Sequence, residues 1–425
     1  MIKSITKKLR AWYYKVLYSI AFYPVLLSVL FLIVAAITNR VESLDFIIKI
    51  KEKVPYLFIS DYDTSRAILN TLVAGILSLT VFSFSMVMVV LNQASSNFSP
   101  RVLPSLISNK KHQLILGFYI GTLLYCIFSL ITLGAKGVDS NAIGFSTMLA
   151  AVFSVVCIVL FVDFIHNIST SIQINTIVDR IYTSSSKSLQ KAYDEQHQKT
   201  TLSVLETDDF KPLMVKETGY YLSFDVSLLS DSYKDEELQI NVLPYLNQHL
   251  WEGDVIATVS KNLSDQQVDD LLFGFSLSTN RHSGDEGVGG MIKLMEIAVK
   301  AMSPGINDPG TAIEAITKLG KLLYQAVAFA NATSENIVDT KWIVVSHNIA
   351  IEELMRIVVQ PIRFYAKEDC TVLYQLIKAL KYCLTNPNIS EDNKESIVSE
   401  LMLIKTTVAK HIDSAADKEV LLKLF

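Results

Sequence analysis

The sequence predicts an α-helical membrane domain with four transmembrane helices, followed by a soluble α+β domain made of a small β-rich unit and then helices. Half of the 425 residues are hydrophobic and 19% are charged. This is too apolar for an ordinary soluble protein and too charged for one that lies wholly within a membrane. The long apolar stretches all lie near the N-terminus, and the sequence becomes polar after residue 166.

Four stretches are each long enough to cross a bilayer core of roughly 30 Å. They span about residues 17–37, 67–91, 114–134 and 142–166. We therefore expect a transmembrane domain over residues 1–166 and a helical connector over 167–200. A β-rich subdomain over 201–280 and a helical subdomain over 281–425 follow. Basic residues gather on the flanks that share a side with the N-terminus, which predicts that both termini are cytoplasmic.

Charge is divided unevenly along the chain. Residues 1–166 carry 14 basic and 7 acidic side chains, whereas the rest of the chain carries 24 basic and 35 acidic ones. Because binding to phosphate backbones needs a positive surface, this acidic soluble part argues against a nucleic-acid partner. The same negative charge raises the local concentration of cations.

The second span has one polar stripe along an otherwise apolar helix. Thr71, Ser78, Ser85 and Asn92 recur every seven residues, and Phe82 and Val89 lie on the same stripe. Seven residues advance a helix by about 700°, so successive members differ by only about 20°. Such a stripe suits a helix that lines a water-filled pore. It equally suits a dry contact between helices, where small and hydroxyl residues allow close approach.

Three ionisable residues are predicted near the inner mouth of such a pore. Arg101 follows the second span, and Asp163 and His166 end the fourth. Ionisable residues at helix ends commonly lie at the membrane interface, and the alternative is that this pair influences ion passage or senses pH.

The soluble part contains one distinctive turn. Ser303, Pro304, Asn307, Asp308 and Pro309 belong to the run SPGINDP, in which Asp308 is a good N-cap and Pro309 suits the first helical position. We expect a buried, rigid turn that links two helices. Helices are expected over residues 291–302, 312–330, 338–366 and 370–425.

Several short motifs resemble those of one family. They are Ser99–Leu103 (SPRVL), Arg281 with Gly290, Ala301–Ala312 (AMSPGINDPGTA) and Ile362–Tyr365 (IRFY). Together they resemble a bacterial family of predicted integral membrane proteins that is catalogued as a domain of unknown function. The resemblance implies four N-terminal spans and a cytoplasmic domain, and it implies no established reaction.

Motifs of known chemistry are absent. The sequence has no HExxH, GxSxG or Walker-type loop, and its four cysteines lack metal-ligand spacing. We therefore expect neither an enzyme nor a metal or cofactor site. A polar site formed by Arg281 with Asn307 and Asp308 is the alternative, although the sequence offers no nucleophile or metal for it.

A single striped helix per chain can enclose a pathway only in a ring of identical chains. The sequence therefore favours a homo-oligomeric ion channel of the bacterial inner membrane, with the lipid bilayer and inorganic ions as its partners. A non-conducting membrane scaffold or signalling protein with a cytoplasmic docking domain is the alternative.

Overall fold

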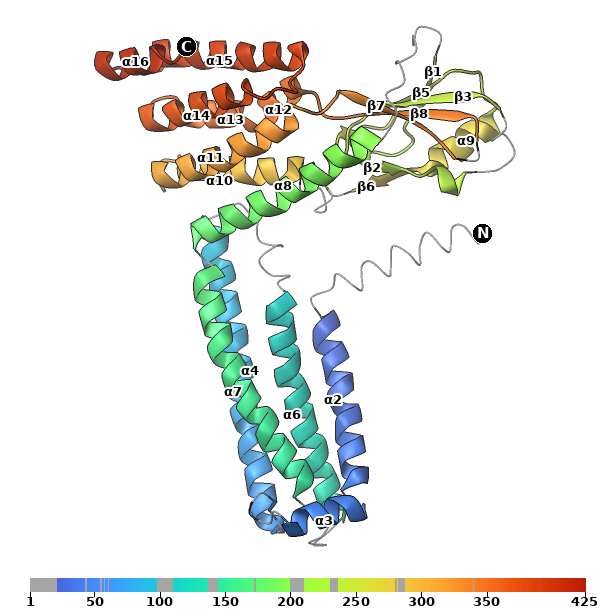
Figure 1. Ribbon diagram of the computed structural model, residues 1–425, viewed down its shortest axis with the longest axis vertical. Helices are drawn as coiled ribbons and strands as arrows, with labels where there is room; N and C mark the ends of the chain where they lie inside the picture. The colour runs from blue at the N-terminus through green and yellow to red at the C-terminus, as the bar shows by residue number, and fades with distance from the viewer. Residues whose placement is uncertain are drawn as a thin grey trace. The chain divides into compact units, whose positions relative to one another are not determined.

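The computed structural model describes residues 21–42, 44–53, 56, 58–59, 61–97, 110–136, 144–171, 173–198, 210–229, 236–279, 281, 287–338 and 340–425. The chain forms two compact units, Met1–Gln173 and Ile174–Phe425 (Figure 1).

Four helices of the first unit are long and apolar enough to cross a membrane, within the part of the chain that the structure describes. They are α2 (Phe22–Val41), α4 (Tyr62–Asn97), α6 (Lys110–Lys136) and α7 (Phe145–Ser171), and the short helix α3 (Asp45–Lys53) follows α2. This confirms the four predicted membrane helices. Helix α4 extends beyond the predicted span at both ends. The side chain of Asp61 begins it by accepting a hydrogen bond from the amide of Thr64 (2.8 Å).

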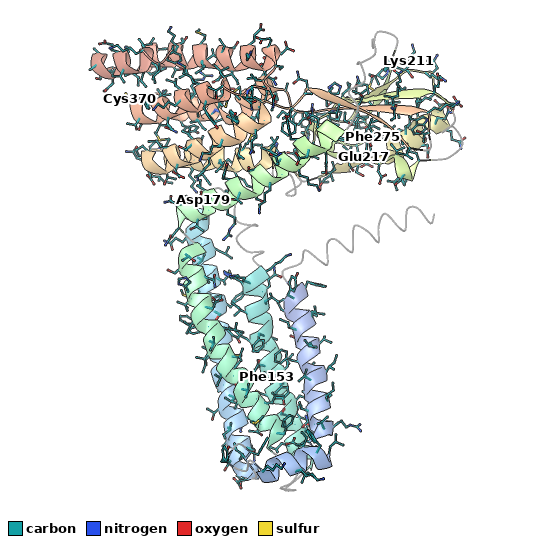
Figure 2. All side chains as sticks on the ribbon, viewed as in Figure 1. Phe153, Asp179, Lys211, Glu217, Phe275 and Cys370 are labelled. Atoms are coloured by element: carbon teal, nitrogen blue, oxygen red, sulfur yellow. The ribbon has the colours of Figure 1, made fainter. Side chains whose placement is uncertain are left out.

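Glycine allows α2 and α6 to approach closely. A Cβ atom added at Gly117 would lie 2.9 Å from the Cα atom of Pro24, and one added at Gly121 would lie 2.8 Å from the ring of Phe31. This is the spacing of small residues that brings membrane helices together. Phe31 also contacts Phe153 of α7, with 5.0 Å between ring centroids, so aromatic rings fill the space between helices (Figure 2).

A buried acid joins three helices at the end of α2. The side chain of Glu42 is 1% exposed and accepts hydrogen bonds from the amide of Phe145 (2.7 Å) and the hydroxyl of Ser146 (2.5 Å). Its other partner is Lys51 of α3, whose Nζ atom lies 3.3 Å away. Glu42 thus caps α7 from a distant part of the chain.

The second unit contains two β-sheets. The larger has the strand order β1-β5-β3-β8-β7, formed by Lys211–Met214, Val255–Val259, Leu238–Val242, Trp342–His347 and Ala332–Asn336. Only its β3–β8 pair is parallel among the described pairs. The smaller has the order β4-β2-β6, formed by His249–Leu250, Gly219–Phe224 and Phe275–Ser278. A 3₁₀ turn, η3 (Val226–Leu228), and helix α9 (Asp265–Gly274) complete this part.

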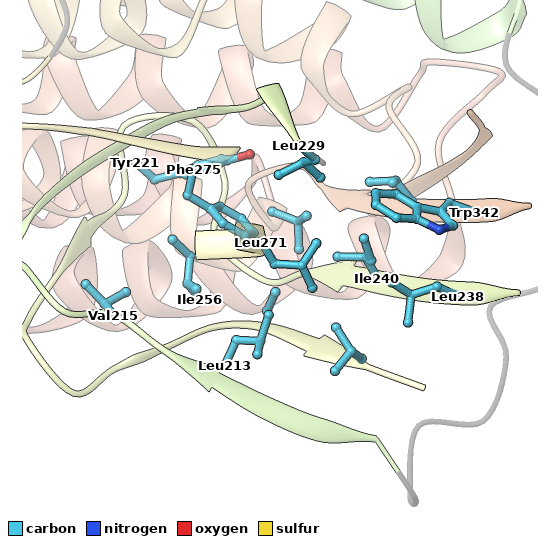
Figure 3. Close-up of a cluster of buried hydrophobic side chains, with 14 of the residues drawn as sticks. Leu213, Val215, Tyr221, Leu229, Leu238, Ile240, Ile256, Leu271, Phe275 and Trp342 are labelled. Carbon is cyan, nitrogen blue, oxygen red and sulfur yellow. The ribbon is translucent and has the colours of Figure 1, made fainter. Parts of the chain in front are cut away.

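One hydrophobic core holds these strands and α9 together. Figure 3 shows Trp342 of β8 and Leu271 of α9 with Ile240 and Ile256 of the larger sheet, and all four side chains are at most 1% exposed. Burial of large apolar side chains supplies most of the stabilisation of such a core.

The prediction of a helix over residues 338–366 was wrong in its first part. Trp342–His347 forms β8, and Ala332–Asn336, just before it, forms β7. The segment is rich in β-branched residues, and its side chains alternate between more and less buried positions. Pairing with β3, about a hundred residues earlier, adds both strands to the sheet. The sheet therefore draws on residues from the predicted helical subdomain.

The rest of the unit is helical. It consists of α8 (Ile174–Gln198), α10 (Val288–Ala301), α11 (Pro309–Ala326), α12 (Ile351–Val358), α13 (Gln360–Tyr365), α14 (Cys370–Cys383), α15 (Glu391–His411) and α16 (Ala415–Leu422). Helix α8 lies along α11, where Lys318 forms an ion pair with Asp179 (2.6 Å) and Gln325 donates to the hydroxyl of Ser186 (2.9 Å). On another side, Gly320 of α11 contacts α14.

The close contact between α11 and α14 generates a test of the packing. A Cβ atom at position 320 would lie 2.7 Å from the Cβ atom of Ala379. The methyl group of alanine cannot move away by rotation of the side chain. We expect Gly320→Ala to destabilise this unit by about 1–2 kcal/mol, because overpacking outweighs the gain in helix propensity. Thermal unfolding of the full chain in detergent measures this. The control is Gly310→Ala in the same helix, where the nearest atom is 3.4 Å away. Equal melting temperatures for the two variants would refute the close contact.

Candidate functional site

Helix α4 is buried on one side only. Ser65, Leu69, Ile76 and Ser83 are each at most 3% exposed, and they lie on the face that packs against α6 and α7. Their spacing of four, seven and seven residues marks one stripe along the helix. The opposite side of α4 is left largely uncovered by the described residues of its own chain.

The predicted polar stripe lies on this uncovered side. Thr71, Ser78, Ser85 and Asn92 are all exposed, and Phe82 and Val89 are 48% and 57% exposed. The structure thus brings the six predicted pore-lining residues onto one accessible face. A Cβ atom at Gly75, on the same stripe, would meet no atom within 4 Å.

From Leu77 to Met88, the uncovered side has a second half that is apolar. Leu77, Val81, Phe84 and Met88 are 45–58% exposed. At about 100° per residue they form a separate stripe beside the polar one. An apolar half suits lipid, whereas hydroxyl and amide groups need water or a polar partner. The two halves of the uncovered face therefore suit different surroundings.

Hydrogen bonding differs along the polar half. Thr71 donates to the carbonyl of Ala67 and Ser78 donates to the carbonyl of Ala74, each at 2.9 Å. Within the described residues, the side chains of Ser85 and Asn92 have no such partner. The end of the stripe toward Asn92 therefore has unmet hydrogen-bonding capacity. Phe82 is held from one side, since its ring lies edge-on to Phe161 of α7 at 5.7 Å.

The predicted inner-mouth residues are placed only in part. Arg101 lies outside the described residues. Asp163 and His166 are exposed on α7, and no described interaction joins their side chains. Helix α7 continues to Ser171, so the two residues lie about one to two turns before its end rather than closing it.

The turn from Ser303 to Pro309 links α10 and α11 as predicted. The hydroxyl of Ser303 donates to the carbonyl of Lys300 (2.6 Å), and the carboxylate of Asp308 accepts from the amide of Thr311 (3.1 Å). Pro309 is the first residue of α11. Asn307 has a φ of 48°, in the left-handed region that asparagine tolerates better than most residues.

The prediction that this turn is buried was wrong. Pro304, Asn307 and Asp308 are exposed, Ser303 and Pro309 are partly exposed, and Ile306 at its tip is 42% exposed. The capping bonds join the turn to the ends of the two helices that it links, so it needs no covering element. No described hydrogen bond or ion pair joins Arg281 to Asn307 or Asp308. Burial raises the pKa of Tyr245, and the charge of Arg281 opposes that rise.

The cap at Asp308 gives a testable prediction. Hydrogen bonds from the hydroxyl and amide of Thr311 hold the pKa of Asp308 below its usual value. We expect Asp308→Ala to lower the free energy of unfolding by about 1 kcal/mol at pH 7, and Asp308→Asn to lower it less because asparagine also caps helices.

The pH dependence follows from the lowered pKa. The charged cap stabilises the fold fully above the pKa of the unfolded chain, about 3.9, and that stabilisation is lost as the pH falls through the lower folded value. The difference in the free energy of unfolding between wild type and Asp308→Asn should therefore become smaller at acidic pH. Urea unfolding at several pH values measures it, with the exposed Asp413→Ala as control. A difference in the free energy of unfolding that does not change with pH would contradict the capping role of the charged Asp308.

Two groups of polar residues were not identified from the sequence. Glu42 is one, and its only signal is an acid directly after an apolar span. The other is a basic hollow between α13 and α15, which includes Arg363 of the IRFY motif. In both cases the partners come from distant parts of the chain.

Comparison with known proteins agrees with the membrane helices. Uncharacterized proteins of Mycobacterium bovis and of two strains of Mycobacterium tuberculosis are each 24% identical to this chain over 269 residues. The match covers 60% of this chain and 51% of each relative, so the chain spans about half the length of the curated relatives it matches. No solved structure matches the chain.

Residues 18–382 match the family described as predicted membrane protein, DUF2254. This range includes the four apolar helices, both sheets and the SPGINDP turn. The chain therefore belongs to the DUF2254 family of predicted membrane proteins.

Proposed function

We propose that this membrane protein is a homo-oligomeric ion channel in which α4 of each copy lines a central pore. The observation that carries the proposal is the uncovered face of α4, with its polar half beside an apolar half. Ser85 and Asn92 have no partner among the described residues of their own chain. Such groups are unfavourable against lipid and are satisfied by water in a pore.

A ring of copies is needed because one chain offers one such face. Cyclic symmetry places the same residues of every copy around one axis. The hydroxyl and amide groups of Thr71, Ser78, Ser85 and Asn92 then form successive polar rings that hydrate passing ions. Leu77, Val81, Phe84 and Met88 face lipid or the neighbouring copy.

Apolar rings separate the polar ones. Phe82 lies between Ser78 and Ser85, and Val89 lies between Ser85 and Asn92. Rings of this kind gate a pore by expelling water from its narrowest part. Since Phe82 rests against Phe161, a movement of α7 would shift Phe82 and change the width of the constriction.

We place the protein in the bacterial inner membrane with both termini and the second unit in the cytoplasm. The charge distribution supports this orientation. The excess of acidic residues after residue 166, 35 against 24 basic ones, concentrates cations near the inner mouth. Arg101, Asp163 and His166 would act at this mouth on the ions that enter.

A non-conducting scaffold with a cytoplasmic docking domain is the second candidate. The observation that favours it is that Thr71 and Ser78 already bond to carbonyls of their own helix. Hydroxyl groups satisfied in this way also suit a dry contact between copies. We propose no catalytic role for Asp308, whose carboxylate is occupied by Thr311.

Conductance of the purified full chain in planar bilayers tests the proposal. We expect Ser85→Leu to reduce the unitary conductance by at least half, because it replaces a hydrating ring by an apolar one. Phe82→Ser should increase the time spent open, because it wets the constriction.

Matched controls come from the apolar half of the same face. Val81→Leu and Phe84→Ser alter residues that are 58% and 57% exposed but lie off the polar stripe, and both should conduct as wild type does. If well-folded oligomers carry no current, the scaffold replaces the channel. Equal changes in conductance for Val81→Leu and Ser85→Leu would show that the polar stripe of α4 does not line the pathway.

A further inference from the structure

A hollow of about 420 Å³ opens on the helical part of the second unit. Its lining combines α13, Lys367 shortly after it and the last turns of α15: Gln360, Pro361, Arg363, Phe364, Lys367, Thr407 and His411. The lining includes an arginine, a lysine and a histidine, and within the described residues it includes no carboxylate. The volume falls in the range of small-molecule sites.

Arg363 is held in place at the floor of this hollow. Its Nε atom donates to Oε1 of Glu400 at 2.8 Å, and the two side chains are 19% and 7% exposed. Burial raises the pKa of Glu400, and the charge of Arg363 opposes that rise. A buried pair of this kind costs desolvation, and it fixes the orientation of the guanidinium group. The terminal nitrogens of Arg363 have no further partner among the described residues.

A second cation and an aromatic ring stand at the rim. The Nζ atom of Lys367 lies 5.8 Å from the ring centroid of Phe364, and the Phe364 side chain is 65% exposed. Lys367 also lies 3.7 Å from Glu368, an exposed neighbour in sequence. An exposed aromatic ring beside a cation offers a planar group a surface for stacking.

The positive lining is unusual for this part of the chain, where acidic residues outnumber basic ones by 35 to 24 after residue 166. Guanidinium and ammonium groups together bind phosphate strongly, since both supply charge-assisted hydrogen bonds. The hollow therefore has the chemistry of an anion site with an aromatic wall.

We propose that this hollow binds a mononucleotide, with the phosphate held by Arg363, Lys367 and His411 and the base stacked on Phe364. The guanidinium and the ammonium supply the charge, and the imidazole supplies a further donor. Stacking of bases on exposed aromatic side chains tolerates any base because every base has a π-face. The inference is independent of conduction, since the site would bind its ligand in a channel or in a scaffold.

Isothermal titration of the purified full chain in detergent, with AMP as the probe, tests this inference. We expect one AMP per chain, and about tenfold weaker binding for Lys367→Gln because a charge-assisted contact is lost. Phe364→Ala should weaken AMP binding while leaving the weaker binding of inorganic phosphate unchanged, which separates stacking from charge.

Lys410→Gln is the control, because Lys410 is exposed on the same helix as His411 and does not line the hollow. It should bind AMP as wild type does. No heat of binding with folded protein at millimolar AMP would overturn the proposal. So would equal losses for Lys367→Gln and Lys410→Gln, which would indicate non-specific attraction of anions. Conductance is not part of this readout, so failure here leaves the channel proposal untouched.

Discussion

Polar side chains within a bilayer must find water or a polar partner, and this requirement governs α4 more than any other helix of the protein. Its buried face is held against α6 and α7, while its other face is largely exposed and only Phe82 on the polar stripe is seen, within the described residues, to contact another ring, that of Phe161. Two stripes divide that face, one apolar and one with a polar residue every seven positions. A lone chain surrounded by lipid would leave Ser85 and Asn92 unsatisfied, and assembly of copies around water removes that penalty.

Specific contacts hold the other membrane helices together. Gly117 and Gly121 draw α6 onto α2, aromatic rings fill the centre, and Glu42 ties the end of α2 to the start of α7. Helix α4 then packs by one stripe only, with Phe82 braced against Phe161. If the protein conducts as proposed, a change in the packing of α7 would reach the pore through that aromatic contact.

The sequence predicted features that depend on local pattern and missed those that depend on distant partners. Length and hydropathy were enough for the four membrane helices, and a seven-residue period was enough to place Thr71 to Asn92 on one face. Strand β8 was missed because its pairing with β3 joins residues about a hundred positions apart. The exposure of the Asp308 turn, the burial of Glu42 and the hollow at Arg363 likewise depend on the packing of distant elements. No local pattern predicts these features.

The most direct test of the central claim is the accessibility of α4 to a charged, water-soluble thiol reagent. Cysteines would be introduced singly at positions 71, 78 and 85 and, for comparison, at 77, 81 and 84, in a Cys370→Ser background because the other native cysteines are buried. Thiols react as thiolates in water and not in lipid. We predict that cysteines at positions 71, 78 and 85 are labelled rapidly in membranes and that cysteines at 77, 81 and 84 are labelled little. Protection of positions 78 and 85, with labelling no faster than at 77 and 81, would contradict a water-lined α4.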